Sequence, residues 1–324
     1  MKKQKIIISC GGTGGHIFPA LEIANSLVLH NKNIDILFVG ALGKMEMTKV
    51  PKQGFPIKGL WIQGFYRGSI FKNILLPLKM FISLIQSIYI LIIHRPIAVI
   101  GTGGFASGPM LFISSLFNCK TYIQEQNFCA GITNKLLSKL VCKIFVAHDG
   151  MDKFFPKNKI INLGNPVRQS LRQSFSNKLD ALSFFKLKKD KVTVLVLGGS
   201  LGAEPINKSL LNNLEELQNN NIQIIWQTGS GHYTNYKDLE SSTCVIHKFI
   251  DNMEMAYLAA DIVVSRAGAI AISEICFLSK ASILIPSPHV TDDHQTVNAK
   301  YLLDYGACLM ICEQFINEQI IDKI

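Results

Sequence analysis

Short apolar runs alternate with longer stretches of helical periodicity along most of the chain. An apolar run of a few residues between turn residues is typical of a buried strand, whereas apolar residues three and four positions apart are typical of a helix. Strands that alternate with helices indicate βαβ units around a parallel sheet. In the first half, the pattern predicts strands at 5–10, 34–40, 56–62, 97–100, 120–124, 142–147 and 160–163, and helices at 17–30, 44–50, 70–94, 107–117 and 131–140.

A glycine–proline break divides this pattern near the middle of the chain. Gly164 and Pro166 lie in the segment 162–168, where neither a helix nor a strand is expected to continue. A second series then begins, with strands predicted at 192–197, 222–227, 243–247, 261–264, 282–285 and 308–312, and helices at 204–218, 252–259, 270–279 and 294–304. We therefore predict an α/β protein of two doubly wound domains, 1–163 and 164–324, with a ligand cleft between the carboxyl edges of their sheets.

The segment 74–93 is apolar over the length of a membrane span. Lys79, Ser83, Gln86 and Ser87 nevertheless form a polar stripe along it at helical spacing, and the segment lies between two strands of one predicted sheet. A span at this place would separate those strands. We therefore predict a long amphipathic helix with one face on the sheet.

The chain is basic, with a formal net charge of +10 and a pI near 9.1. A basic surface attracts nucleic acid, anionic lipid or phosphorylated substrates. The sequence holds no recognised nucleic-acid-binding motif and no interleaving of basic with aromatic residues, so we expect no nucleic-acid partner. Arg67, Lys72 and Lys79 instead stand beside the apolar segment 74–93, and we expect this part of the protein to rest on an anionic membrane surface.

Eight cysteines are scattered along the chain without a C-x-x-C pair, and most lie within apolar runs. A cysteine in such a run behaves as a small hydrophobe, so neither a zinc site nor a disulfide framework is expected. Reduced thiols fit a reducing compartment. The apolar core near the N-terminus is too short for a secretion signal, and we expect a cytoplasmic protein.

Four glycine-rich loops follow predicted strands, at 11–15, 101–104, 198–202 and 265–268. Glycine permits positive φ and lets a phosphate or a sugar approach the bare backbone, while a following helix adds its amides and its dipole. One such loop is weak evidence, because it occurs in many nucleotide-binding folds. Four loops shared between two domains indicate a site for two phosphorylated ligands.

The first loop also carries His16, the only ionisable side chain between Lys5 and Glu22 apart from the Cys10 thiol. A histidine at the mouth of such a loop can move a proton at neutral pH. It can equally well do no more than cap backbone groups at the start of a helix. The loop by itself does not decide between these two interpretations.

The details of the same loop disfavour a dehydrogenase. Ile17 occupies the place of the third glycine of the dinucleotide fingerprint. Asp35 follows about twenty residues further on, but at the start of the next predicted strand rather than at its end, where a ribose-binding acid belongs.

A series of motifs extends over nearly the whole chain. They are GGTGGHIFPA at 11–20, GTGGFASGP at 101–109, QEQN at 124–127, GNPVR at 164–168, GGSLGA at 198–203, FIDNM at 249–253, RAGAIAISE at 266–274 and DDHQTVNA at 292–299. In this order they resemble the MurG family of N-acetylglucosaminyltransferases, which make the lipid-linked disaccharide-peptide precursor of bacterial peptidoglycan. The resemblance implies a GT-B fold, in which two Rossmann-like domains face each other across a cleft, and it implies no cofactor and no metal.

The resemblance also implies the reaction and where it takes place. N-acetylglucosamine is expected to pass from UDP-N-acetylglucosamine, held by the second domain, to the 4-hydroxyl of undecaprenyl-diphospho-N-acetylmuramoyl-pentapeptide, held by the first domain. The anomeric carbon is expected to invert. The enzyme would act as a peripheral protein on the cytoplasmic face of the bacterial inner membrane, with cell-wall synthesis proteins as further partners.

The matched motifs imply the site residues. Those near the donor sugar and the acceptor diphosphate are Thr13, Gly14 and Gly15, with Gly103 and Gly104 also at the acceptor diphosphate. His16 is implied as the general base, and Asn127 as a second catalytic residue that contacts the transferred sugar or orients the acceptor. The implied donor contacts are Arg168 and Ser200 (diphosphate), Ile250 (uracil), Ala269, Ile270, Ala271, Ile272 and Ser273 (helix-start amides), Glu274 (ribose) and Gln295 (sugar hydroxyls).

The chain departs from the family pattern at Gln124, where relatives often have histidine, and at its end, because Ile324 comes earlier than the family's usual terminus. Two other functions stay open: another GT-B glycolipid glycosyltransferase, such as a diacylglycerol galactosyltransferase, and a non-catalytic sugar-nucleotide-binding membrane subunit. Taken in isolation, Arg168 fits a salt bridge in the linker, and Glu274 fits a solvated helix face.

Overall fold

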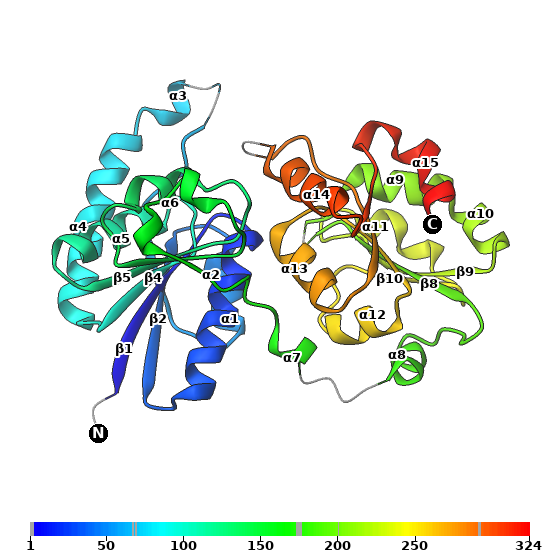
Figure 1. Cartoon of the computed structure of the whole chain (residues 1–324), viewed down its shortest axis with the longest axis horizontal. Helices are drawn as coiled ribbons and strands as arrows, with labels where there is room; N and C mark the ends of the chain where they lie inside the picture. Colours follow the sequence, from blue (N-terminus) through cyan, green and yellow to red (C-terminus); the bar gives the residue numbers. More distant parts are fainter. Residues whose placement is uncertain (1–2, 67, 69, 173–176, 200, 291–292) are drawn as a thin grey trace. The chain divides into compact units, whose positions relative to one another are not determined.

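The computed structural model describes residues 3–66, 68, 70–172, 177–199, 201–290 and 293–324. The chain forms two compact units, Met1–Pro166 (unit 1) and Val167–Ile324 (unit 2), and each is built on its own parallel sheet (Figure 1). The division falls inside the glycine–proline break, whereas the predicted domains meet between residues 163 and 164.

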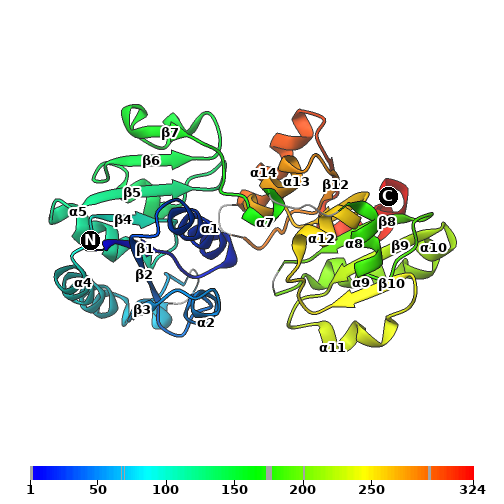
Figure 2. The same cartoon turned by 90° about the horizontal axis from the view of Figure 1, so that it is seen from below.

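Unit 1 contains a seven-stranded sheet in the order β3-β2-β1-β4-β5-β6-β7 (Figure 2). Its strands are β1 (Gln4–Ser9), β2 (Ile34–Ala41), β3 (Ile57–Leu60), β4 (Ala98–Gly101), β5 (Lys120–Glu125), β6 (Lys143–Val146) and β7 (Ile160–Asn162). All neighbouring strands pair in parallel. Every predicted strand of this half is present, because short apolar runs between turn residues are buried on both faces of a parallel sheet.

The helices of unit 1 are α1 (Gly14–His30), α2 (Glu46–Lys52), α3 (Ile70–Asn73), α4 (Leu76–His94), α5 (Ser107–Leu116) and α6 (Ile132–Leu137), with two short 3-10 turns at Met151–Lys153 and Lys157–Lys159. The helix predicted at 70–94 is therefore confirmed in its place, but a turn at residues 74–75 divides it into α3 and α4. Pro77 lies in the first turn of α4, where a residue without an amide proton is favoured, so the second helix begins there.

Alternate residues of β1 point to opposite faces of the sheet. Ile7 packs with Val99 and with residues of α4, α5 and α6, whereas Ile8 packs with Phe38 and with residues of α1. The two helical layers therefore cover opposite faces, as right-handed crossovers in opposite directions from β1 require.

Unit 2 repeats this arrangement around a six-stranded parallel sheet in the order β10-β9-β8-β11-β12-β13. The strands are β8 (Val192–Leu197), β9 (Ile222–Gln227), β10 (Cys244–His247), β11 (Ile262–Ser265), β12 (Ala281–Leu284) and β13 (Leu309–Met310). The predicted helices appear as α9 (Glu204–Asn212), α10 (Leu214–Asn219), α12 (Met253–Ala259), α13 (Ala269–Phe277) and α14 (His294–Asp304). The helix predicted at 204–218 is divided at Asn213, whose φ of −108° and ψ of 7° interrupt the helix.

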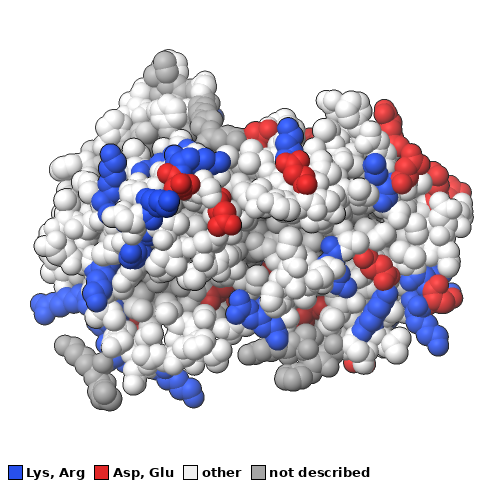
Figure 3. All heavy atoms as spheres, in the orientation of Figure 1, with Lys and Arg blue, Asp and Glu red and all other residues white. Residues whose placement is uncertain are grey.

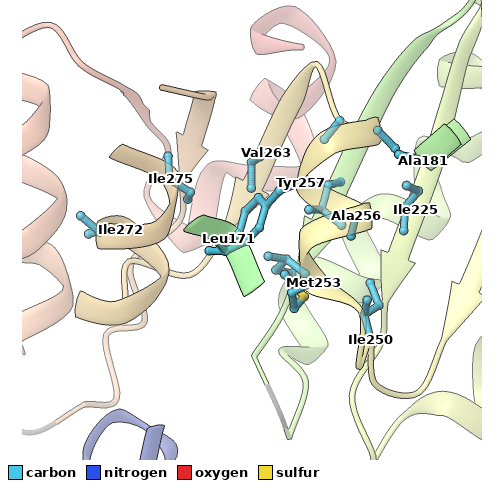
Figure 4. Close-up of a cluster of buried hydrophobic side chains, with 14 of the residues drawn as sticks. Leu171, Ala181, Ile225, Ile250, Met253, Ala256, Tyr257, Val263, Ile272 and Ile275 are labelled. Carbon is cyan, nitrogen blue, oxygen red and sulfur yellow. The ribbon is translucent and has the colours of Figure 1, made fainter. Parts of the chain in front are cut away.

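Four helices of unit 2 were not predicted: α7 (Gln169–Arg172), α8 (Lys178–Phe184), α11 (Tyr233–Tyr236) and α15 (Ile316–Lys323). Each has eight residues or fewer, and a segment this short shows its helical periodicity only weakly. Figure 4 shows the core that α7 helps to form, where Leu171 lies near Tyr257 of α12, with Met253 and Ile275 nearby.

Helix α4 presents its polar stripe to the protein, the reverse of an ordinary amphipathic surface helix. Ser83 and Ser87 are completely buried, and Gln86 accepts a hydrogen bond from the backbone amide of Trp61, at 2.8 Å. The outer side is apolar instead, with Phe81 61% exposed. The prediction that one face packs on the unit is correct, but the outward face is not the polar one.

Candidate active site

The glycine-rich loops lie at the topological switch point of each sheet. The first loop follows β1 and the second follows β4, and these two strands are neighbours from which the chain winds in opposite directions. In unit 2, the loop 198–203 follows β8, and the loop 266–268 follows β11, its neighbour. Open α/β sheets bind their ligands at this point, outside the carboxyl ends of the strands. Each unit therefore has two glycine-rich loops where a ligand is expected.

His16 lies in the first turn of α1, because the helix begins at Gly14 rather than at the predicted residue 17. Its Nδ1 is 3.1 Å from the backbone carbonyl oxygen of Thr102, in the second loop, and the Thr102 hydroxyl donates to the carbonyl oxygen of His16 at 2.8 Å. A carbonyl oxygen only accepts hydrogen bonds, so in the neutral ring Nδ1 carries the proton and Nε2 is the basic nitrogen. The second loop thus sets the tautomer that a general base requires.

Gly103 and Gly104 let the second loop approach His16 closely. Both have positive φ, 100° and 80°. A Cβ added at Gly103 would lie 2.8 Å from Nδ1 of His16, and one at Gly104 would lie 2.1 Å from the carbonyl oxygen of Gly11. These two glycines therefore make room for the first loop, and this packing role exists besides any contact with a diphosphate.

The QEQN segment is organised by the buried carboxylate of Glu125. Its Oε2 accepts from the amide of Gly131 at 2.9 Å and from Nδ2 of Asn134 at 2.8 Å. Its Oε1 accepts from the backbone amide of Asn127 at 3.2 Å and from the side-chain amide of Asn127 at 3.4 Å. Glu125 therefore fixes the position of the implied catalytic Asn127, and the sequence analysis gave no role to it.

The same segment is tied to its neighbours through Gln126. Its Nε2 donates to the Thr102 carbonyl oxygen at 2.7 Å, the acceptor that also holds His16. Its own carbonyl oxygen accepts from Nδ2 of Asn165 at 3.0 Å and lies 3.2 Å from Nε2 of His148. Burial lowers the pKa of His148 to about 4, so its ring is neutral at neutral pH and Nε2 can donate to this carbonyl.

Gln124, the departure from the family pattern, has a structural position. Its side chain is buried, its Nε2 donates to Oδ1 of Asn165 at 2.9 Å, and its Oε1 accepts from Nε2 of Gln126. A glutamine can make both contacts at once because its amide has a donor and an acceptor. The residue joins the end of β5 to the segment that precedes unit 2.

In unit 2, two glycine-containing loops pack against each other next to β8. A Cβ at Gly202 would lie 2.2 Å from the Thr228 carbonyl oxygen, and one at Gly229 would lie 2.1 Å from the Gly202 amide nitrogen. Ser200, implied at the donor diphosphate, lies outside the described residues.

Gln227, at the end of β9, connects the glycine-rich loop 198–203 with Ile250, the implied uracil contact. Its Nε2 donates to the carbonyl oxygen of Gly199 at 3.0 Å, and its Oε1 accepts from the amide of Ile250 at 2.9 Å. The Ile250 side chain is buried, so the backbone is the part of this residue that a ligand can meet. Sequence reasoning missed Gln227, because a glutamine within an apolar strand carries no motif.

The structure brings Arg168 and Glu274 together. They form an ion pair with each other, whereas the resemblance implied that each contacts a different part of the donor. Nε of Arg168 lies 2.8 Å from Oε1 of Glu274, and the Tyr257 hydroxyl donates to Oε2 at 3.1 Å. Burial, followed by the nearby Glu274 carboxylate, raises the pKa of Tyr257 well above its ordinary value, so the hydroxyl keeps its proton. The Glu274 side chain is only 3% exposed, so a solvated helix face is the wrong description, whereas the salt bridge considered for Arg168 is present.

Helix α13 offers fewer amides than the resemblance implied. The amide of Ile272 donates to the Gly268 carbonyl oxygen at 3.0 Å, and the Ile272 side chain belongs to the core. The hydroxyl of Ser273 donates to the carbonyl oxygen of Ala269 at 2.8 Å. The open first turn consists of Ala269, Ile270 and Ala271, which are the positions whose amides a ligand can approach.

Gln295 and Arg266 hold the segment that follows β12. Oε1 of Gln295 accepts from the amide of Ser287 at 2.9 Å. Arg266 donates to the carbonyl oxygens of Ile285 at 3.2 Å and Pro286 at 3.3 Å and pairs with Glu313. The sequence analysis quoted Arg266 within a motif but gave it no role.

No group of three or more His, Cys, Asp or Glu side chains suited to a metal ion occurs in the described part of the chain.

Comparison with protein families matches both units. Residues 6–146 match the glycosyltransferase family 28 N-terminal domain, and residues 193–324 match the glycosyltransferase family 28 C-terminal domain. Together these two matches cover most of the chain.

Individual relatives agree with these matches. The UDP-N-acetylglucosamine–N-acetylmuramyl-(pentapeptide) pyrophosphoryl-undecaprenol N-acetylglucosamine transferase of Flavobacterium psychrophilum is 47% identical over 98% of this chain and 87% of that protein. The protein of the same name from Phocaeicola vulgatus is 46% identical over 98% of this chain and 86% of its own length.

Solved structures agree with the fold. The crystal structure of Acinetobacter baumannii MurG matches with a TM-score of 0.73 and 27% identity, over 99% of this chain and 90% of that one. The calicheamicin glycosyltransferase CalG4 is similar in fold alone, with a TM-score of 0.70 and 11% identity over 100% of this chain and 90% of its own.

Two Rossmann-like units with glycine-rich loops at both switch points define the class, the GT-B glycosyltransferases. The relatives then give the particular group. The chain belongs to the MurG family of N-acetylglucosaminyltransferases, within glycosyltransferase family 28.

Proposed function

We propose that this chain transfers N-acetylglucosamine from UDP-N-acetylglucosamine to the 4-hydroxyl of undecaprenyl-diphospho-N-acetylmuramoyl-pentapeptide, the step that completes the lipid-linked peptidoglycan precursor. The names of the relatives supply the donor and the lipid acceptor. The observation that carries the chemistry is His16, placed at the switch point of unit 1 with its Nδ1 on the Thr102 carbonyl oxygen.

The proposed mechanism is a single displacement. Nε2 of His16 takes the proton of the acceptor hydroxyl as that oxygen bonds to the anomeric carbon of the donor sugar. The bond between that carbon and the diphosphate oxygen breaks, UDP leaves with the electron pair, and the configuration inverts. Negative charge grows on the leaving diphosphate, where a guanidinium such as that of Arg168 and the first amides of α13 would stabilise it.

A direct assay tests this proposal. The chain is incubated with UDP-N-acetylglucosamine and a short-chain analogue of the muramoyl lipid, and release of UDP and the disaccharide product are both measured. Product formation is expected. UDP binding without product would instead support a non-catalytic subunit, and transfer only to a diacylglycerol acceptor would support another glycolipid transferase.

The Gln227→Ala variant is expected to bind UDP about tenfold more weakly, because two hydrogen bonds that join the Gly199 and Ile250 backbones are lost. Isothermal titration calorimetry measures this affinity. Gln218→Ala is the matched control, since this half-buried glutamine contacts Thr243 on the same unit, away from the glycine loops. Equal affinities of the two variants would show that Gln227 does not organise the donor site.

We further propose that unit 1 rests on the cytoplasmic face of the bacterial inner membrane. Its residues 1–166 hold 19 Lys and Arg against 6 Asp and Glu, a net charge of +13, whereas residues 167–324 hold 14 against 17, a net charge of −3. The basic excess of the chain therefore belongs to the unit that is expected to take the lipid-linked acceptor. Figure 3 shows blue Lys and Arg side chains among largely white surface on this unit.

The apolar outer side of α4 lies on this same basic unit and offers a surface that can contact lipid. Exposed apolar residues of this part of the chain are Phe71 of α3, Ile74 and Leu75 in the turn before α4, Leu78, Phe81, Ile85 and Tyr89 of α4, Leu116 of α5 and Leu136 of α6. The segment Phe71–His94 is long and apolar enough to cross a membrane, but α4 is packed along α5, and the chain enters it from β3 and leaves it into β4 of one sheet. Binding in the plane of the interface keeps this packing intact.

The Leu75→Glu, Phe81→Glu double variant is expected to lose most of its flotation with vesicles of anionic phospholipid, because both side chains are more than half exposed and a carboxylate there repels the bilayer. A Leu179→Glu, Leu211→Glu variant places the same charges on exposed leucines of unit 2 and is expected to float like the native chain. If the two variants float to the same extent, the assignment of α4 as the membrane-binding surface is contradicted.

A further inference from the structure

The side chain of Glu46, the first residue of α2, is completely buried beside the first glycine loop. Burial of a carboxylate is costly unless hydrogen bonds or an opposite charge compensate for lost water. Within the described residues, no Lys, Arg or His forms an ion pair with Glu46. Backbone amides take that role instead: Gly12 donates to Oε1 and Oε2, at 3.3 and 3.2 Å, and Ala41 donates to Oε1 at 2.9 Å.

Two glycines form the slot that this side chain fills. A Cβ added at Gly11 would lie 2.4 Å from Oε1 of Glu46, and one at Gly40 would lie 2.4 Å from its Cγ. Real Cβ atoms do not approach other atoms so closely, so any other residue at either position would push the carboxylate away. Gly11 is therefore needed for an internal carboxylate, whereas the sequence alone suggested that it admits a phosphate.

The position of this loop decides the position of His16. The Gly11 carbonyl oxygen lies where a Cβ of Gly104 would be, and the His16 ring lies against Gly103, so the first and second loops are in contact at both points. His16 is four residues beyond Gly12, in the helix turn that the loop opens. A shift of the Gly12 backbone would therefore change the contact between Nδ1 and the Thr102 carbonyl oxygen.

We propose that Glu46 is a positioning residue of the transfer reaction, whose carboxylate binds the Gly12 amide and thereby holds His16 against the second loop. The inference rests on the proposed role of His16 as the base. It has one consequence for substrate binding. Because Glu46 already occupies the Gly12 amide, the acceptor diphosphate must be bound by other groups, such as the first amides of α1 and the second loop.

The test compares Glu46→Gln with the native chain in the transfer assay. A glutamine fills the same volume, and its oxygen can keep the place of Oε1, which accepts from Gly12 and Ala41. Its NH2 group then replaces Oε2 and stands against the Gly12 amide, which is also a donor, so the loop should shift. A displacement of about 1 Å at a catalytic group can cost up to 10²-fold. We expect kcat to fall about 10- to 100-fold, with the KM for UDP-N-acetylglucosamine changed less than twofold, because the donor is bound by unit 2. Asp152→Asn, an exposed acid of unit 1, is the matched control and should keep native kcat.

A second variant disturbs the slot while Glu46 and the glycine loop keep their own residues. Gly40→Ala places its Cβ against Cγ of Glu46, so it should lower kcat in the same way. In a Glu46→Ala background that clash is gone, so adding Gly40→Ala should lower kcat hardly any further. This non-additivity distinguishes displacement of Glu46 from a general loss of stability.

The outcomes separate the inference from the proposed function. A chain whose His16→Ala variant is inactive, but whose Glu46→Gln and Gly40→Ala variants both keep native kcat, overturns the inference and leaves the function intact. Additive losses from Gly40→Ala and Glu46→Ala overturn it as well. If the native chain itself transfers no sugar, the proposed function fails first.

Discussion

The His16→Ala variant should transfer N-acetylglucosamine about 10²- to 10⁴-fold more slowly than the native chain, while it binds UDP with unchanged affinity. The rate falls because the attacking hydroxyl loses the group that removes its proton. UDP affinity is unchanged because the donor is expected on unit 2, whereas His16 is held by the Thr102 carbonyl oxygen of unit 1. Single-turnover rates and calorimetry with UDP measure the two quantities separately.

Two further variants make this prediction specific. His16→Asn can still donate from its amide to the Thr102 carbonyl oxygen but holds no basic nitrogen, so it should be as slow as His16→Ala. His30→Ala removes an exposed histidine at the other end of α1, whose Nδ1 also contacts a backbone carbonyl oxygen, at 2.8 Å from Ser26, and it should keep the native rate. A fast His16→Asn enzyme would mean that the ring only holds the two loops together.

The second large effect is expected from Arg168→Ala, which should destabilise unit 2 by about 3 kcal/mol and weaken UDP binding. Glu274 is 3% exposed, and without Arg168 its buried carboxylate loses the positive charge beside it, while the hydrogen bond from the Tyr257 hydroxyl stays. Removing one partner of a buried ion pair is costly because the remaining charge stays out of water.

Unit 2 can be observed by itself in this experiment. The chain has two tryptophans, Trp61 in unit 1 and the fully buried Trp226 in unit 2, so in a Trp61→Phe background the fluorescence of Trp226 reports unfolding of unit 2. Arg172→Ala, an exposed arginine of α7, is the control and should change the free energy of unfolding by less than about 0.5 kcal/mol. Equal midpoints for Arg168→Ala and Arg172→Ala would show that the pair with Glu274 adds nothing to stability.

The strands and most helices could be predicted because a parallel sheet with covering helices produces a clear hydrophobic pattern in the sequence. Strands such as β1 and β8 are buried on both faces, so each is a continuous apolar run, and the helices between them are long enough to show their period. Short helices such as α7 and α15 show this pattern only weakly. Their packing on unit 2 stabilises them more than their local sequence does.

The orientation of α4 could not be predicted from its pattern. A polar stripe ordinarily faces water, and the rule fails here because Ser83 and Ser87 donate to carbonyl oxygens within their own helix, Met80 and Ser83. Small hydroxyl groups that are satisfied in this way can be buried at low cost. The apolar side is then left outside, where a membrane is proposed to cover it.

The candidate site was predictable where a motif marks it and not where a single side chain organises the backbone. The glycine-rich loops and His16 can be recognised from the sequence because few other sequences combine them. Glu46 and Gln227 act on the amides of Gly12 and Ile250 across 34 and 23 positions of sequence, and such contacts leave no local pattern. The pairing of Arg168 with Glu274 was likewise hidden, since the segment before α7 and helix α13 meet only in the folded unit.

The distance from Nε2 of His16 to the attacking hydroxyl, measured in a crystal structure with UDP and a short-chain acceptor analogue bound, tests the central claim most directly. A base at His16 requires about 2.6–3.2 Å, or one bridging water, with Nδ1 still on the Thr102 carbonyl oxygen. A hydroxyl that lies beyond that reach and contacts another basic group instead would contradict the role of His16.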